Sequence, residues 1–209
     1  IFCNDTPGFL GNRVGVYAIQ VAMTEAFKMG LTIEEADSIY GQPMGIPKTG
    51  VFGLYDLIGL DLMSDVLKSF KKELPKEDSF HKVAKNNTLV TQLIREGYTG
   101  RKGKGGFYRM KIENGKKVLE AINLQTNEYS QAKKIDPVLK NYEEILEKNK
   151  STHKRNPINI YIDEKYQKYE SSVKSKIIKY AKFLIPEVTN DPNNIDEAMR
   201  LGFNWTNGP

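Results

Sequence analysis

Apolar residues recur at helical spacing through most of the first half of the chain. The longest such stretch covers residues 11–29, and Gly30 follows it as a helix stop. Its apolar positions are Val14, Ala18, Val21, Ala22, Met23 and Phe27. A second helix is predicted over residues 33–40, because Thr32 and Glu35 have the spacing of a capping box. A long helix followed closely by a short one is therefore expected near the start.

Glycine and proline interrupt this pattern over residues 41–50, which we expect to form a loop. Helical periodicity returns over residues 51–74, and Pro75 closes the predicted helix. It returns once more over residues 79–97, where a glycine marks the end of a further helix. Apart from the loop, the first half is predicted to be largely helical.

The pattern changes after a glycine-rich run at residues 100–106. Residues 107–112 and 116–122 flank the sequence Glu-Asn-Gly, a turn that favours a β-hairpin. Helical periodicity then resumes over residues 137–150 and again towards Leu184, and a second, short helix is predicted over residues 194–202. The sequence therefore predicts an all-α, mainly helical fold with a small β-hairpin.

Two segments far apart in the chain are similar to each other. TIEEADSIYGQPMGIP at 32–47 is similar to NIDEAMRLGFNWTNGP at 194–209, and a long amphipathic helix precedes both. This shared order predicts an internal repeat, with a chance likeness of two helical hairpins as the alternative. Because the second copy stops at its loop and the chain does not begin with Met, we expect a piece of a longer protein.

Composition narrows the class of protein. Hydrophobic residues make up 39% and charged residues 27%, and there is no apolar run long enough to span a membrane and no signal peptide. Cys3 is the only cysteine, which rules out an internal disulfide and fits a cytoplasmic protein. His81 and His153 are far apart in sequence, so no metal site is expected.

The net charge of +5 is spread along the chain, with lysines interleaved among acids. Such a pattern is typical of a solvated surface and disfavours nucleic acid as a partner, whereas a small ligand carrying phosphates suits it better. The run GRKGKGG at 100–106 follows a helix and precedes a strand, the reverse of a dinucleotide fingerprint. As a positively charged loop it still allows Lys102 and Lys104 to reach an anionic ligand.

Asn12 is the candidate for chemistry. The segment DTPGFLGNR at 5–13 places its neutral amide after a rigid Pro-Gly turn, where it can orient a carbonyl and donate to a developing oxyanion. An ordinary asparagine at a helix start is the alternative, and local sequence alone favours it. His81 and His153 have no partner spaced for a proton relay, so no self-sufficient catalytic group is expected.

Three segments, in this order, resemble the C-terminal region of 3-hydroxyacyl-CoA dehydrogenase. They are NDTPGFLGNRVGVYAIQVAMTEAFKMG, GQPMGIPKTGVFGLYDLIGLD and NNTLVTQLIREGYTGRKGKGGFYRMK. The resemblance covers residues 1–110 well and residues 172–209 moderately. It divides the chain into a first C-terminal helical domain (1–110), a hairpin, helix and linker (111–156) and the start of a second, truncated copy (157–209).

The resemblance implies a fold like the C-terminal domain of 6-phosphogluconate dehydrogenase and an NAD-dependent enzyme of fatty-acid β-oxidation. Such an enzyme oxidises L-3-hydroxyacyl-CoA to 3-ketoacyl-CoA, with NAD and a catalytic histidine–glutamate pair on an upstream Rossmann domain. It also implies a homodimer or an intrachain pseudo-dimer of tandem copies, and in some bacterial proteins a fusion to enoyl-CoA hydratase. The fragment alone is then expected to be inactive.

Two residues match functional positions of that family. Asn12 matches the asparagine of the PGF-x-x-NR motif near the substrate oxygen, and Lys102 matches a basic residue implicated in contacting NAD. The second copy lacks an Asn-Arg step, so no second active site is expected in it. Two alternatives remain: a non-catalytic helical module for dimerisation or acyl-CoA binding, and a related dehydrogenase of free 3-hydroxy acids.

Overall fold

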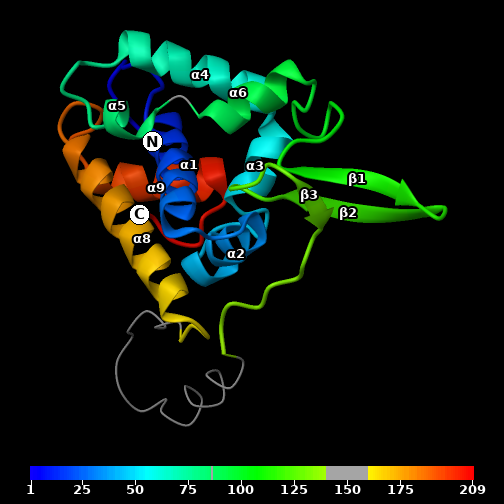
Figure 1. Cartoon of the computed structure of the whole chain (residues 1–209). Helices are drawn as coiled ribbons and strands as arrows, with labels where there is room; N and C mark the ends of the chain where they lie inside the picture. Colours follow the sequence, from blue (N-terminus) through cyan, green and yellow to red (C-terminus); the bar gives the residue numbers. More distant parts are fainter. Residues whose placement is uncertain (86, 140–159) are drawn as a thin grey trace.

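The computed structural model describes residues 1–85, 87–139 and 160–209, and shows helices packed around a central one, with a small sheet projecting from the side (Figure 1). The helices are α1 (Gly11–Met29), α2 (Ile33–Ile39), the short 3₁₀ helix η1 (Gln42–Met44), α3 (Val51–Ile58), α4 (Leu60–Glu73), α5 (Phe80–Val83), α6 (Thr88–Arg95), α8 (Glu164–Phe183) and α9 (Pro192–Phe203). The strands are β1 (Tyr108–Glu113), β2 (Lys116–Ile122) and β3 (Tyr129–Gln131). The predicted fold class, mainly helical with a small hairpin, is confirmed.

Helix α1 forms the centre of the core, and most of its side chains are buried. It packs along α8 and against α9, which bring the second half of the chain onto the first (Figure 1). Gly30 ends α1 in the left-handed conformation, with φ of 64°, as predicted. The capping box of α2 is also confirmed, because Thr32 Oγ1 accepts from the Glu35 backbone N–H and Glu35 Oε2 accepts from the Thr32 N–H.

The single helix predicted over residues 51–74 is wrong. It is two helices, α3 and α4, divided at Gly59, whose φ of 108° cannot continue a helix. The helix predicted over residues 79–97 is likewise divided into α5 and α6. A new helix begins at Asn87, whose side-chain oxygen accepts hydrogen bonds from two backbone N–H groups of the first turn of α6.

The predicted hairpin is confirmed but belongs to a larger sheet. β1 pairs antiparallel with β2, Tyr108 opposite Ala121, and the turn places Asn114 and Gly115 at positive φ. β3 then pairs with the other edge of β2, which the sequence analysis did not anticipate. The boundary expected after residue 110 falls inside β1.

In the second half, the predicted long and short helices correspond to α8 and α9. Residues 140–150 of the helix expected over 137–150, and the linker expected after it up to residue 156, lie outside the described residues. Within the part of the chain that the structure describes, no helix is both long enough and apolar enough to cross a membrane. The same residues contain no group of three His, Cys, Asp or Glu side chains that could hold a metal ion.

Candidate functional site

Asn12 lies in the first turn of α1, where its side chain is exposed. The side-chain amide of Asn12 makes no hydrogen bond to any of the described residues. The turn before it is fixed: the backbone N–H of Phe9 donates to the Thr6 carbonyl at 2.9 Å, and Gly8 has φ of 78° and lies directly against the Phe70 ring of α4. The amide is therefore presented outwards from a rigid support.

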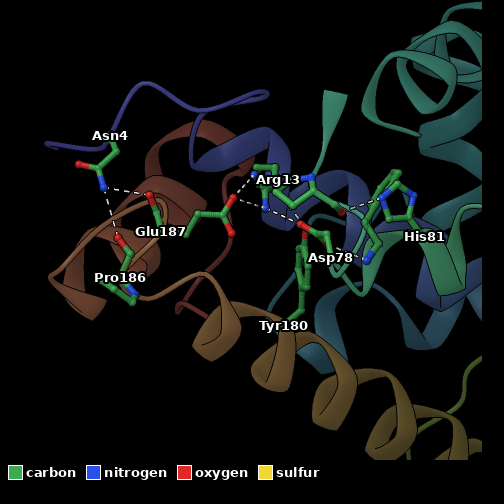
Figure 2. Close-up of polar contacts among 9 residues, drawn as sticks. Asn4, Arg13, Asp78, His81, Tyr180, Pro186 and Glu187 are labelled. Atoms are coloured by element: carbon green, nitrogen blue, oxygen red, sulfur yellow. Dashed lines mark hydrogen bonds and ion pairs between the residues drawn. The ribbon is translucent and has the colours of Figure 1, made fainter. Parts of the chain in front are cut away.

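The side chain of the neighbouring Arg13 points into the core and is fully buried (Figure 2). Its Nη2 donates to Asp78 Oδ2 at 2.5 Å, and its Nε donates to the Tyr180 hydroxyl at 3.2 Å. Asp78, which is also buried, accepts from the Phe80 backbone N–H at 2.7 Å through its other oxygen. A buried charge with this set of partners fixes the start of α1 to both α5 and α8.

The same arginine also reaches the segment between α8 and α9. Arg13 Nη1 lies 3.3 Å from Glu187 Oε1, and Asn4 donates to the backbone carbonyls of Pro186 and Glu187 (Figure 2). Tyr17 of α1 stacks on Tyr180 of α8 with ring centroids 3.8 Å apart. The second half of the chain thus helps to fix the orientation of the residue next to Asn12.

The loop that carries Lys102 is fastened by one buried carboxylate. Asp56, at 3% exposure, accepts from the backbone N–H groups of Phe107 at 2.8 Å and Tyr108 at 2.7 Å, while its own carbonyl accepts from the Arg101 N–H at 2.8 Å. Both ends of the glycine-rich run are therefore attached to α3. Burial raises the pKa of Asp56 to about 6 despite the hydrogen bonds from these donors.

Lys102 itself is exposed and lies beside the start of α4, where its ammonium is 2.9 Å from Asp61 Oδ1. Together with the Leu62 backbone N–H, Lys102 holds the pKa of Asp61 below its ordinary value. Lys104, the other cation expected to reach a ligand, donates to the backbone carbonyl of Glu96 at 3.2 Å. Asn12 and Lys102 stand on different elements and make no hydrogen bond or ion pair with each other in the described chain.

Neither histidine is part of a candidate site in the described residues. His81 contacts the Pro75 carbonyl through Nε2 at 2.9 Å, and His153 lies outside the described residues. The sequence analysis missed Arg13, Asp56 and Asp78 as buried ionic groups. The signal for Arg13 was its position, because it lies among mostly apolar residues at the start of a helix whose buried positions are largely hydrophobic.

Comparison with known proteins identifies the family. Residues 8–110 match the family model described as "3-hydroxyacyl-CoA dehydrogenase, C-terminal domain". The whole chain is 37% identical to a "Putative fatty acid oxidation complex trifunctional enzyme" of Rickettsia prowazekii, of which it covers 27%. It is 28% identical over its whole length to a "Probable 3-hydroxyacyl-CoA dehydrogenase" of Bacillus subtilis, of which it covers 25%.

The chain thus spans about a quarter of the length of these relatives. The family match contains Asn12, Arg13, Asp56 and Lys102, and both relatives also align with residues 157–209. The helical fold, the segment matched by the family model and the names of the relatives all indicate the same family. Residues 8–110 of this chain belong to the 3-hydroxyacyl-CoA dehydrogenase C-terminal domain family.

Proposed function

We propose that this chain is the C-terminal part of an NAD-dependent L-3-hydroxyacyl-CoA dehydrogenase of fatty-acid β-oxidation. The observation that carries the proposal is the pair of neighbouring side chains at the start of α1: Asn12 is exposed and Arg13 is fully buried. An exposed amide on a rigid backbone support is suited to a substrate on an adjoining domain. The relatives, about four times longer, leave room for an upstream Rossmann domain and for an enoyl-CoA hydratase fusion.

In this proposal Asn12 orients the substrate oxygen at C3 and donates to it as its carbonyl character develops. A neutral amide can do this without altering the charge of the site. The anchored neighbour Arg13 keeps the first turn of α1 in place, so little ordering is needed when substrate binds. The base that removes the hydroxyl proton belongs to the upstream domain.

Lys102 is the residue of this chain proposed to contact NAD, which when bound supplies the acceptor for the hydride that leaves C3. The residues present fit such a role, because the ammonium is exposed and Asp61 holds it at a defined position. A lysine ammonium is a suitable donor for the phosphates of a dinucleotide. Most of the cofactor-binding residues are proposed to lie upstream of this chain.

The two copies are proposed to form an intrachain pseudo-dimer, as opposed to a homodimer through the same face. Glu25 of α1 pairs with Lys176 Nζ at 2.6 Å and accepts from Ser172 Oγ at 2.6 Å, both on α8. Conversely, Glu187, which follows α8, forms an ion pair with Arg13 of α1. Each glutamate stands eight residues before the isoleucine at the second position of its copy of the repeated motif, so the two glutamates occupy equivalent positions, and each contacts the long helix of the other copy.

The corresponding loops also meet. The backbone N–H of Thr206 donates to the Gly45 carbonyl at 2.7 Å, which joins the two loops that follow the short helices. Phe203 packs on Gly15 of α1, where a Cβ atom would collide with the ring. This contact covers the face of α1 that a second chain would need, and it supports the assignment of 157–209 as a second copy.

The test is an assay of NADH formation with L-3-hydroxyacyl-CoA, using this chain alone and joined to its natural upstream sequence. We expect no turnover by the chain alone and turnover by the longer protein. Failure of the longer protein with acyl-CoA substrates would leave the non-catalytic module as the better assignment. Turnover of free 3-hydroxy acids but not CoA esters would instead identify the related class of dehydrogenase.

A further inference from the structure

A second surface of the molecule has the features of a ligand site, and it is separate from Asn12. A groove of about 960 Å³ lies between the sheet on one side and α2 and α3 on the other. Figure 1 shows the sheet extending away beside these two helices. The volume is in the range of pockets that bind small molecules.

Cationic side chains from four separate segments border this groove. They are Lys48 in the loop before α3, Arg101 and Lys104 in the glycine-rich loop, Arg109 in β1 and Lys133 after β3. Arg109 is neutralised by Glu120 at 2.7 Å. Lys48, Arg101 and Lys133 have exposed side chains, and none of the three forms an ion pair with a described carboxylate. Convergence of unpaired cations on a concave surface attracts anions.

The acids that line the groove, Glu34, Asp37 and Asp56, are fewer than its cations and offset their charge only in part. Asp37 accepts from the backbone N–H groups of Phe52 and Gly53 and from the Tyr108 hydroxyl, and Asp56 is engaged by the loop as described. Burial raises the pKa of Asp37 to about 7, so its negative charge is reduced near neutral pH. Glu34 accepts from the Lys133 backbone N–H at 3.1 Å.

The wall formed by the sheet is apolar and exposed. Met110 and Leu119 face each other across β1 and β2 and are 56% and 45% exposed, and Ile135 joins them along the groove. A flat apolar ring placed on these side chains would bury them, while attached phosphates would reach the cations opposite. The glycine-rich rim is already fastened by Asp56, so binding would cost little ordering of the loop.

We propose that this groove binds an adenine nucleotide, with its pyrophosphate facing Lys48, Arg101 and Lys133 and its base on the wall of Met110 and Leu119. Free nucleotides and the adenosine end of a CoA ester share this chemistry. The site is made by this chain alone, and it needs no hydroxyacyl substrate and no hydride transfer. The result of a binding test at this groove is therefore independent of the function proposed above.

The experiment is isothermal titration calorimetry of this chain with ADP, coenzyme A and inorganic pyrophosphate at low ionic strength. We expect saturable binding of one ADP per chain, and weaker binding of pyrophosphate because it lacks a ring for the apolar wall. Coenzyme A binding more tightly than ADP would indicate the CoA source, and equal binding would indicate free nucleotide; both support the site. Absence of ADP binding would overturn the proposal.

Matched variants separate this site from general attraction by a basic protein. Lys48→Ala with Lys133→Ala should weaken ADP binding about tenfold. The control pair, Lys82→Ala with Lys179→Ala, removes the same charge from exposed positions on α5 and α8 and should leave binding unchanged. An equal loss in both pairs would mean nonspecific attraction and would overturn the proposal.

The apolar wall has its own test. Leu119→Ser should weaken the binding of ADP and coenzyme A but leave that of pyrophosphate unchanged. Because Leu119 is already 45% exposed, the fold should tolerate the change. Unchanged ADP binding by this variant would contradict the placement of the base.

Discussion

The buried ion pair between Arg13 and Asp78 gives the sharpest prediction of stability. Both side chains are fully buried and their charged atoms lie 2.5 Å apart. Replacing Arg13 with Met leaves the Asp78 charge inside the protein with only the Phe80 N–H and the Tyr180 hydroxyl as donors. Removing one partner of a buried pair costs about 3–5 kcal/mol.

This cost is large for a domain whose total stability is about 5–15 kcal/mol. For a chain of this size, we expect Arg13→Met to lower the melting temperature by roughly 10 °C. Urea unfolding followed by far-UV circular dichroism and by the fluorescence of Trp205 gives the free energy of unfolding. Trp205 is buried near the end of the chain, after α9, so agreement of the two signals checks that the two halves of the chain unfold together.

The matched control is the double variant Arg13→Met with Asp78→Asn. Asparagine keeps an acceptor for the Phe80 N–H but removes the unpaired buried charge, so the double variant should lie within about 2 kcal/mol of the wild-type protein. A loss below about 1 kcal/mol for the single variant would refute the reasoning. So would a double variant that is no more stable than the single one.

Three further predictions follow from the same contacts. The pKa of Asp37 is raised to about 7 and that of Asp56 to about 6, so at these pH values the folded chain still binds protons that the unfolded chain has released. The free energy of unfolding should therefore fall between about pH 5 and about pH 8. Urea titrations that show equal or greater stability at the higher pH would contradict this. Gly15→Ala should lower the free energy of unfolding by about 1–3 kcal/mol, because the added methyl group collides with an aromatic ring of α9. Gly202→Ala has open space around it and should be neutral or stabilising in thermal unfolding. Similar effects of the two substitutions would contradict this prediction. Asp56→Asn should loosen the loop at 100–107 and speed its cleavage by trypsin, and an unchanged cleavage rate would show that the carboxylate does not fasten it.

Periodicity and end signals predicted the elements that depend on local sequence. Helix α1 ends at Gly30 and α2 begins with the Thr32 capping box because both signals act within a few residues. The division at Gly59 was not predicted, since apolar spacing continues across it. There the backbone N–H of Leu60 donates to the carbonyl of Thr99, so the break depends on a contact between distant segments.

The supports of the candidate site could not be predicted for the same reason. Arg13 finds Asp78 65 residues away and Glu187 174 residues away, and only the folded chain brings them together. Asp56 resembles an ordinary helical acid until the ends of the glycine-rich loop reach it. The family resemblance pointed to Asn12 and Lys102, but it carried no information on what holds them.

The central claim is that Asn12 faces the reacting oxygen of a 3-hydroxyacyl-CoA. The most direct measurement is kcat and KM for the Asn12→Ala variant of the protein that includes the upstream domain, beside Thr24→Ala as a control at an exposed position of the same helix. Loss of a donor to a developing oxyanion lowers kcat by about 10²–10³, and we predict this for Asn12→Ala and no change for Thr24→Ala. Wild-type kcat and KM in the Asn12→Ala variant would contradict the account.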